Sequence, residues 1–305
     1  MYMKEENTMM DFQQFTGAVK AGLQEFFPYA SIRVAPAEKN NGLFLTGITI
    51  IEPGCRVMPT IYLDGAYCSY KKGVALAELV AELADLYREN RLKEEPEIPN
   101  ILDFEAVKDL ICCRLINRER NISRLEKMPH RDFLDLAIIY YIPVKISGRD
   151  DGQASITVLN EHSAHWTVDS DTLHARAVAN TERLFPTVLQ SIDEIIRKQW
   201  PVDVQFPESD MYVMRNEGSS GGAAAMLNSG VLRQFAKKLG DYYIFPSSIH
   251  EVIIHPIKMR GLTLGREEVC AMVRDINSSQ VAPEEVLSDN VYYYHTATGK
   301  IEILS

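Results

Sequence analysis

The chain has 305 residues, too many for one small core, so its length predicts two domains or lobes. With 46% apolar and 24% charged residues, the composition is that of a globular protein with ample core-forming side chains. The formal net charge of −10 argues against a general nucleic-acid-binding protein, because neutralising phosphates requires a basic surface. The only dense cationic run, Arg114 to Lys127, is diluted by Glu119 and Glu126, and we interpret it as a solvated helix face.

Cysteine usage and the absence of long apolar runs bear on the compartment. The odd number of cysteines and the lack of a CxxC pair indicate reduced thiols in a cytosol rather than a disulfide framework. The cysteines are Cys55, Cys68, Cys112, Cys113 and Cys270. The first residues lack the apolar core of a signal peptide, and no run approaches the roughly 18 residues of a membrane span. We therefore expect a cytoplasmic protein that does not enter the membrane.

The N-terminal region mixes helical and extended patterns. Asp11 is expected to cap an amphipathic helix that ends before Pro28. Asn40 to Gly42, which lies between two apolar runs, predicts a β-hairpin because Asn-Gly favours the tight hairpin turn. An extended piece at Val57 to Leu63 is followed by a long amphipathic helix from Val74 to about Asn90.

A charged segment with two prolines, Lys93 to Asn100, is the best linker in the first half of the chain. It predicts an N-terminal lobe over residues 1–97 and a C-terminal lobe over residues 98–305. The spacing of apolar residues from Phe104 to Ile111 predicts a helix that continues into the cationic run. A second, shorter helix is expected around Ser123 to Met128.

The middle of the chain contains its most strand-like run, Leu134 to Ile146. A turn at Gly148 to Gly152 and a second strand at Ala154 to Leu159 complete a predicted antiparallel hairpin. The apolar spacing then becomes helical again. Thr172 to Asn180 and Val188 to Arg197 are the two clearest helical segments of this region.

A glycine- and serine-rich stretch separates two further apolar runs, Met211 to Met214 and Ala223 to Leu227. These runs predict another hairpin. The clearest helix of the chain follows, because its apolar residues recur on one face. Either Asn228 or Ser229 is expected to cap it, and Gly240 supplies the left-handed residue that ends it.

The C-terminal part begins with a predicted buried strand at Tyr242 to Phe245. Arg266 to Ile276 predicts a helix, and Pro283 to Glu285 a short one, since proline and acidic residues suit a first turn. Tyr292 to Tyr294 and Ile301 to Ile303 predict a final hairpin. Hairpins interleaved with amphipathic helices indicate an α+β fold rather than a strictly alternating parallel sheet.

Several segments together resemble an uncharacterised bacterial family of the Firmicutes, domain of unknown function 5688. They are Leu115-Ile116-Asn117 with Asn121, Phe133 to Ala137, Trp166 with Leu173, Ala179-Asn180-Thr181 and Pro186, Pro246 to Val252, and Met272-Val273-Arg274-Asp275-Ile276-Asn277 through Val291-Tyr292. The resemblance covers nearly the whole chain from about Phe12. The Pro246 to Val252 segment is also similar to a second uncharacterised family, domain of unknown function 1444. Neither resemblance implies an activity, a cofactor or catalytic residues.

A short polar segment, Ser247, Ser248, His250 and Glu251, contains the residue types of a Ser-His-acid triad. Such a triad needs the base to reach the nucleophile, which close sequence neighbours seldom achieve. Ser248 and Glu251 also have the spacing of a capping box, so a capping or turn role is favoured. His250 and His255 are five residues apart, and this separation does not place them on one face to bind a metal as in a zincin.

Glu161, His162, His165 and His174 form the alternative candidate, a metal site. His162 and His165 share a helix face at i and i+3, and His174 could lie one turn away. Imidazole and carboxylate ligands suit Zn²⁺ or a similar metal. The competing interpretation is a polar surface helix with incidental histidines, since no cysteine or second acidic ligand converges in the sequence.

Two further features have structural as well as functional interpretations. Gly218 to Gly222 could form an anion-binding nest, but it lacks the Lys-Ser/Thr of a P-loop and a wide turn is favoured. Cys112 and Cys113 lie in an apolar run without a nearby histidine, which favours a buried structural role over a reactive one.

The sequence thus leaves three hypotheses. The first is a non-enzymatic accessory protein, associated with mobile elements, that acts through contacts with unidentified protein partners. The second is a hydrolase or metal-dependent enzyme centred on His250 or on the histidines near Trp166. The third is a small-ligand sensor with Arg274 and tyrosines lining a cleft. No cofactor is predicted.

Overall fold

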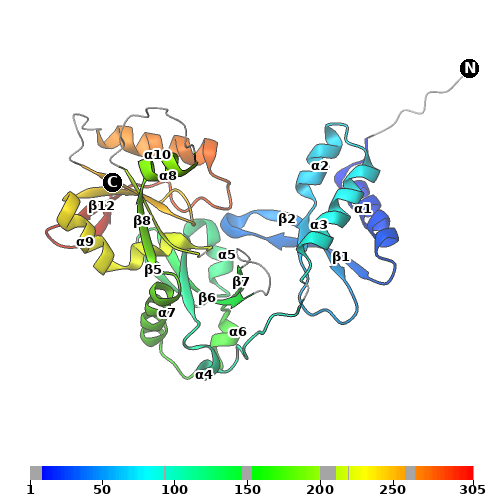
Figure 1. The fold of residues 1–305 in the computed structure, drawn as a ribbon, viewed down its shortest axis with the longest axis horizontal. Coiled ribbons are helices and arrows are strands. Elements are labelled where there is room, and N and C mark those ends of the chain that lie inside the picture. The colour runs from blue at the N-terminus through cyan, green and yellow to red at the C-terminus, as the bar shows by residue number, and fades with distance from the viewer. Residues whose placement is uncertain are drawn as a thin grey trace, which may run out of the picture. The chain divides into compact units, whose positions relative to one another are not determined.

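The computed structural model describes residues 9–92, 94–145, 153–199, 211–218, 220–257 and 265–304. By its internal contacts the chain divides into two compact units, here called the N-terminal and C-terminal units (Figure 1). The N-terminal unit comprises Met1–Lys39 and Leu43–Pro96, and the C-terminal unit comprises Asn40–Gly42 and Glu97–Ser305. Both units combine helices with antiparallel strands, which confirms the α+β prediction.

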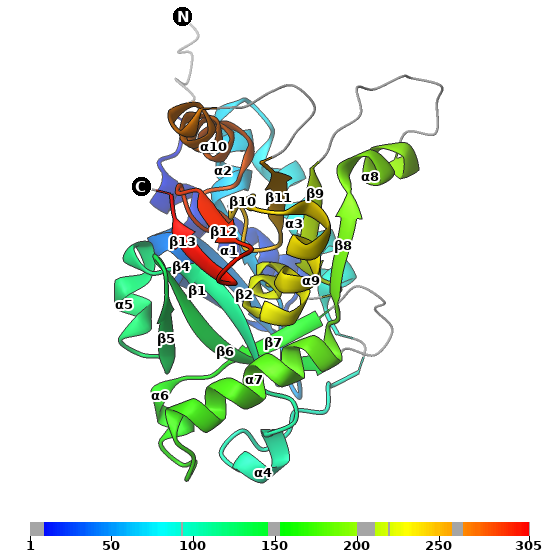
Figure 2. The same cartoon turned by 90° about the vertical axis from the view of Figure 1, so that its left-hand side faces the viewer.

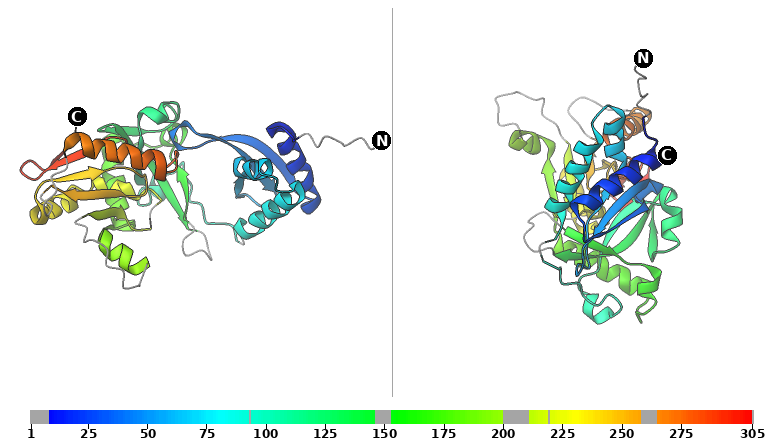
Figure 3. Two further views of the ribbon diagram at one scale, coloured as in Figure 1. Left: turned by 90° about the horizontal axis from the view of Figure 1, so that it is seen from above. Right: turned by 90° about the vertical axis from the view of Figure 1, so that its right-hand side faces the viewer.

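The N-terminal unit packs three helices against a three-stranded antiparallel sheet of order β1-β2-β3. Its elements are α1 (Phe12–Phe26), β1 (Ser31–Glu38), β2 (Phe44–Ile51), β3 (Thr60–Tyr62), α2 (Asp64–Lys71) and α3 (Leu76–Asn90). In the right-hand view of Figure 3, α1 and α3 cross in front of the strands. Phe15 and Leu23 of α1 and Leu83 of α3 pack on Ile48 and Ile50 of β2, which closes a single core.

Local signals predicted most of this unit. Asp11 caps α1 as expected, since its carboxylate accepts from the Gln14 N–H and the Gln14 side chain accepts from the Asp11 N–H. The β1–β2 hairpin is confirmed, and its turn residues Asn41 and Gly42 have φ values of 60° and 68°. The helix α2 was not predicted. It has no buried residue, so the apolar spacing that reveals an amphipathic helix is weak there.

The first sheet of the C-terminal unit is built around β6 (Leu136–Lys145). The strands β4 (Cys112–Asn117), β5 (His130–Phe133) and β7 (Gln153–Thr157) all pair with it in antiparallel fashion. The first seven residues of β6 are all buried, as expected for a strand covered on both faces. The β6–β7 hairpin is confirmed, and its predicted turn lies outside the described residues.

The helix predicted from Phe104 into the cationic run is wrong. Only α4 (Phe104–Val107) is helical, and β4 begins at Cys112. A short apolar run fits either a helix or a strand, and here the pairing of Cys113 with Tyr140 and of Leu115 with Ile138 decides for the strand. Two short helices, α5 (Ile122–Leu125) and α6 (Asn160–Ser163), flank this sheet.

The second sheet of the C-terminal unit has six strands in the order β13-β12-β10-β11-β9-β8 (Figure 2). They are β8 (Thr187–Ser191), β9 (Tyr212–Asn216), β10 (Tyr242–Phe245), β11 (Val252–Pro256), β12 (Tyr292–His295) and β13 (Lys300–Ile303). The helices α9 (Ser229–Leu239) and α10 (Arg266–Gln280) cover opposite faces. Tyr242 packs with Leu232 of α9, whereas its neighbour Tyr243 packs with the cluster around Val273 of α10.

Three predictions in this region are wrong in part or in full. The helix expected over Val188 to Arg197 is confirmed only from Ile192, where α8 (Ile192–Gln199) begins, and its first part is the edge strand β8. The strand expected over Ala223 to Leu227 is a 3₁₀ helix, η3 (Gly222–Leu227), consistent with the low strand preference of its three alanines. Pro283 to Glu285 forms a turn rather than a helix, and its end pairs through an isolated bridge between Val286 and Ser248.

The helix α7 (Ser170–Leu184) and the 3₁₀ helix η3 lie against β4, beneath the six-stranded sheet. Figure 2 shows α7 running below α9 in this unit. The largest core of the unit joins β6, α7, η3, α9 and β10, so the elements around η3 are held by buried contacts on several sides. Among the described residues, no helix combines the length and apolar character needed to cross a bilayer.

Candidate functional site

The predicted Ser-His-acid segment forms a turn between β10 and β11. Residues 246–249 pair with residues 285–288 through backbone hydrogen bonds. The Ser248 hydroxyl accepts from the backbone N–H of His250 at 3.1 Å, which is a hydroxyl-stabilised turn. The predicted capping box does not form, because no helix begins there and Glu251 instead lies 3.6 Å from Arg215.

The ring of His250 is paired with Glu285. Its Nε2 lies 3.3 Å from Oε1 of Glu285, and both side chains are more than 40% exposed. Within the described residues, neither serine hydroxyl has a hydrogen bond with a histidine ring. The geometry therefore lacks the nucleophile–base contact that a triad needs.

The histidines considered as metal ligands do not converge on one point in the described residues. His162 Nδ1 accepts from the Leu159 N–H at 3.1 Å, and its Nε2 lies 3.7 Å from the exposed Glu161 carboxylate. His165 is exposed after α6, whereas His174 lies on α7. In the part of the chain that the structure describes, no three His, Cys, Asp or Glu side chains are placed to hold a metal ion.

The glycines proposed as an anion nest have a packing role. A Cβ at Gly221 would lie 2.6 Å from Cβ of Arg114, and one at Gly222 would lie 2.3 Å from the carbonyl oxygen of His250. These contacts are too close for any side chain, so the two glycines let η3 approach β4 and the turn at His250. Ser219 lies outside the described residues.

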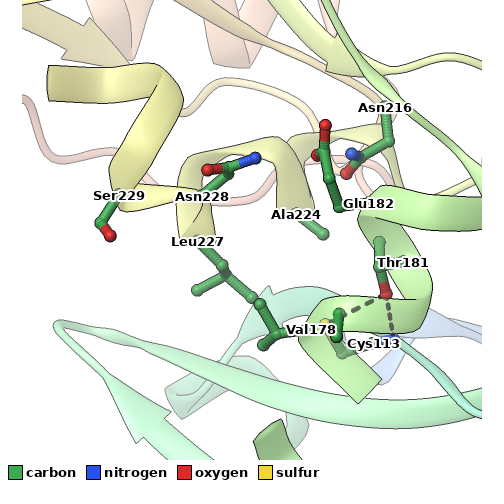
Figure 4. Close-up of a pocket in the computed structure, with 10 residues that line it drawn as sticks. Cys113, Val178, Thr181, Glu182, Asn216, Ala224, Leu227, Asn228 and Ser229 are labelled. Carbon is green, nitrogen blue, oxygen red and sulfur yellow. Dashed lines mark hydrogen bonds between the residues drawn. The ribbon is translucent and has the colours of Figure 1, made fainter. Parts of the chain in front are cut away.

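A pocket of about 250 Å³ opens between α7, β9, η3 and the start of α9 (Figure 4). Its walls come from four separate stretches of the chain. The lining residues are Cys113, Val178, Ala179, Thr181, Glu182, Asn216, Ala224, Leu227, Asn228 and Ser229. Figure 4 shows the polar side chains Glu182, Asn216 and Asn228 along one side and the apolar Val178 and Leu227 along the other.

The floor of this pocket is neutral and hydrogen-bonded. The Thr181 hydroxyl donates to the Ala177 carbonyl at 2.7 Å and accepts from the Cys113 N–H at 2.9 Å. The Cys113 Sγ lies 3.4 Å from the same hydroxyl. Burial raises the pKa of the Cys113 thiol to about 12, so this sulfur is protonated at neutral pH and is not a ready nucleophile.

The polar wall is different, because it contains an unsatisfied acceptor. Asn216 is only 2% exposed, and its Nδ2 donates to the Phe185 carbonyl at 2.8 Å and to Oγ1 of Thr187 at 3.3 Å. These two acceptors fix the orientation of the carboxamide. Its Oδ1 has no hydrogen-bond partner among the residues that the structure describes. A buried acceptor left unpaired costs about 1–3 kcal/mol, so a native fold retains one only for a reason.

Glu182 and Asn216 both form a hydrogen bond with the hydroxyl of Thr187. The Thr187 hydroxyl donates to Oε2 of Glu182 at 2.6 Å, and the Thr187 N–H donates to Oε1 at 3.2 Å. Thr187 thus joins the carboxylate and the carboxamide into one network. Asn228 borders the same pocket as the cap of α9, where its Oδ1 accepts from the N–H groups of Gly230 and Val231.

A second pocket of about 510 Å³ adjoins the first and shares Val178, Leu227 and Ser229 with it. Arg131, Lys300 and His174 border this second pocket. Arg131 is paired with Asp171. Burial lowers the pKa of His174, which favours its neutral imidazole, and the nearby Arg131 lowers it further.

A separate polar cluster brings together three of the segments on which the family resemblance rests. Asp135, between β5 and β6, accepts from the hydroxyl of Ser288 at 2.6 Å, from Nδ2 of Asn290 at 2.9 Å and from the hydroxyl of Tyr292 at 2.5 Å. Asn117 of β4 donates to the carbonyl of Leu287. We call Asp135, Ser288, Asn290 and Tyr292 the Asp135 cluster.

The model of a family of unknown function, DUF5688, matches residues 12–296. The chain belongs to this family. No curated protein and no solved structure matches the chain. Membership of this family therefore does not identify a reaction, and the functional conclusion is drawn from the geometry of the site.

Sequence reasoning missed the pocket. Cys113, Glu182, Asn216 and Asn228 lie on four elements separated by 69, 34 and 12 positions in the chain, so no motif spacing connects them. The one available signal is Asn216, a polar residue that follows Tyr212 and Met214 on one face of β9.

Proposed function

We propose that this chain is a non-enzymatic binding protein whose C-terminal unit takes a small polar ligand in the pocket beside Asn216. The observation that carries the proposal is the Oδ1 atom of Asn216, a buried acceptor without a partner in the wall of a pocket. Buried polar groups in native proteins are nearly always paired, and a ligand donor is the simplest partner for this one.

Binding is favoured over catalysis by the chemistry of the lining. Cys113 is held protonated by burial, and the proton of Thr181 is engaged by the Ala177 carbonyl. Among the described lining residues there is no histidine or lysine to activate either group. The pocket thus offers recognition groups without an activated nucleophile.

The size of the pocket limits the ligand to a small molecule. Pockets for drug-sized ligands hold about 300–1,000 Å³, and this one holds about 250 Å³. The cytoplasmic location expected from the cysteine usage belongs to the proposal. It is supported by five free thiols, two of which are buried.

Two tryptophan substitutions one helical turn apart test the proposal. Ala179 and Ala175 are both exposed on α7, but Ala179 borders the first pocket and Ala175 only the second. We expect Ala179→Trp to obstruct the first pocket and Ala175→Trp to leave it open. The measurement is thermal unfolding of both variants and the wild type in a library of small metabolites.

A ligand of the first pocket should raise the Tm of the wild type and of Ala175→Trp, but not that of Ala179→Trp. At a concentration of 100 Kd the stabilisation amounts to about 2.7 kcal/mol. The proposal fails if no compound separates the two variants.

Contact with a protein partner, the role suggested by the sequence, is a second candidate for the N-terminal unit. Phe26, Tyr29 and Leu86 of this unit are 42%, 90% and 43% exposed. Exposed aromatic side chains are frequent anchors of protein interfaces. We expect Tyr29→Ser to weaken binding to a protein partner, with the exposed Lys20→Ser as control. Equal binding by both variants would remove Tyr29 from the interface.

A further inference from the structure

We propose that the ligand of the first pocket is an organic cation, a protonated primary amine that carries a short hydrocarbon chain. This inference rests on the proposed function and specifies its ligand. It depends on three properties of the pocket: the acceptors on its polar wall, the unbalanced charge of Glu182, and the apolar side opposite them.

The polar wall presents acceptors that need donors. Among the described residues, Oδ1 of Asn216 has no partner, and the Glu182 carboxylate receives hydrogen bonds only from Thr187. A carboxylate has about four acceptor sites, so two donors leave capacity unused. A primary ammonium carries three donors and accepts none, which matches this wall.

The negative charge of Glu182 is not balanced within the described residues, where no Lys, Arg or His forms an ion pair with it. Arg183 is its neighbour in sequence, but that guanidinium bonds the Asp109 carbonyl and Oδ1 of Asn180. Glu182 also lies in the last turn of α7, where the negative end of the helix dipole adds to its charge. A cation at this position is therefore favoured by both sources of charge.

The side opposite the carboxylate is apolar. Val178 and Leu227 line the pocket there (Figure 4). Such a lining suits a hydrocarbon chain attached to the charged group. It does not suit Ca²⁺, which takes six to eight oxygen ligands, because Glu182 is the only carboxylate of the lining.

The test uses protein with ¹³C-labelled Ala, Leu and Val methyl groups. The probes are n-butylammonium, its neutral counterpart 1-butanol, and CaCl₂. We expect n-butylammonium to shift the methyl signals of Ala224, Leu227 and Val178 in a saturable manner. We expect 1-butanol to bind about tenfold more weakly, since it lacks the charge that strengthens the hydrogen bonds.

The decisive variant is Glu182→Gln, which keeps the shape of the side chain and removes its charge. It should weaken n-butylammonium about tenfold and leave 1-butanol nearly unchanged. Glu161→Gln, an exposed carboxylate on α6 that does not line the pocket, is the matched control and should bind as the wild type does.

The possible outcomes separate the two proposals. Equal affinity for n-butylammonium and 1-butanol, unaffected by Glu182→Gln, would overturn the cation inference. The pocket would still stand as a binding site if Ala179→Trp abolished both. Shifts caused by CaCl₂ alone would also overturn the inference. If none of the probes shifts these methyl signals, and no library compound separates Ala179→Trp from Ala175→Trp, both proposals fail.

Discussion

Two polar clusters of the C-terminal unit differ in how their acceptors are used. In the Asp135 cluster, one carboxylate accepts from three side chains on the segment that leads into β12. In the pocket, within the part of the chain that the structure describes, the Glu182 carboxylate accepts from one residue, and the neighbouring Oδ1 of Asn216 accepts from none. Both clusters lie beside buried core, so exposure to water does not explain the difference.

This difference distinguishes polar residues that stabilise the fold from polar residues that are available to a ligand. The donors around Asp135 are all supplied by the chain, so this cluster fastens the last strands to the first sheet. In the pocket wall, by contrast, the described residues supply no donor to Oδ1 of Asn216. We therefore interpret the Asp135 cluster as structural and the pocket as the binding site.

The largest expected effect concerns the floor of the pocket. Burial raises the pKa of the Cys113 thiol to about 12, from its ordinary value of 9.0. Its thiolate fraction near pH 8 is thus lower by about a thousandfold, and its alkylation should slow by at least that factor. Mass spectrometry after iodoacetamide treatment should find the exposed Cys55 modified and Cys113 intact until urea is added. Labelling of Cys113 at the rate of Cys55 would show that the floor of the pocket is accessible to the reagent.

The second largest effect is expected from removing the acceptor at the centre of the Asp135 cluster. Asp135→Ala leaves the fully buried Tyr292 hydroxyl without its acceptor and removes two further hydrogen bonds. We expect the free energy of unfolding of the C-terminal unit to fall by about 3 kcal/mol, measured by urea denaturation. Asp132→Ala is the control, because its pair with Arg118 is exposed and should contribute less than about 1 kcal/mol. Equal losses in the two variants would contradict the structural role of Asp135.

A smaller loss is expected at the rim of the pocket. Asn228→Ala removes the cap of α9, which should cost about 1 kcal/mol in urea denaturation. Asn228→Ser should restore most of the stability, because a serine hydroxyl can also accept from the first N–H groups of the helix. If the alanine and serine variants are equally unstable, capping is not the role of Asn228.

The smallest effect is a pH dependence in the second pocket. Burial lowers the pKa of His174 below its ordinary value of 6.5, so the unfolded chain binds this proton more readily than the folded one. Stability from this group is therefore complete above about pH 6.5 and is lost as the pH falls through the lower, folded pKa. His174→Gln should flatten the decrease in Tm below about pH 6.5. An unchanged slope would mean that His174 does not contribute to it.

The sequence predicted the elements whose patterns are local. Asp11, the Asn41-Gly42 turn and Gly240 mark boundaries through backbone conformation and capping, and each lies where it was expected. The strand β4 and the edge strand β8 were predicted as helices. Their short apolar runs fit both the helical and the strand periodicity, and only pairing with distant strands determines which structure forms.

The candidate site depends even more on distant contacts. The predicted polar residues near His250 were chosen for their closeness in sequence, yet the structure uses Ser248 to stabilise a turn. Asn216 is significant only because the Phe185 carbonyl and Thr187 engage its Nδ2 and leave Oδ1 unpaired. No pattern within one segment contains that information.

The most direct measurement compares two buried asparagines during titration with n-butylammonium. Asn180 uses both ends of its carboxamide, donating to the carbonyls of Lys108 and Ile111 and accepting from Arg183, whereas Oδ1 of Asn216 is unpaired. With ¹⁵N-labelled asparagine, the side-chain amide signal of Asn216 should shift as Oδ1 gains a donor, while that of Asn180 stays in place. A titration that moves neither signal, or moves both equally, would contradict the assignment of this pocket as the binding site of an organic cation.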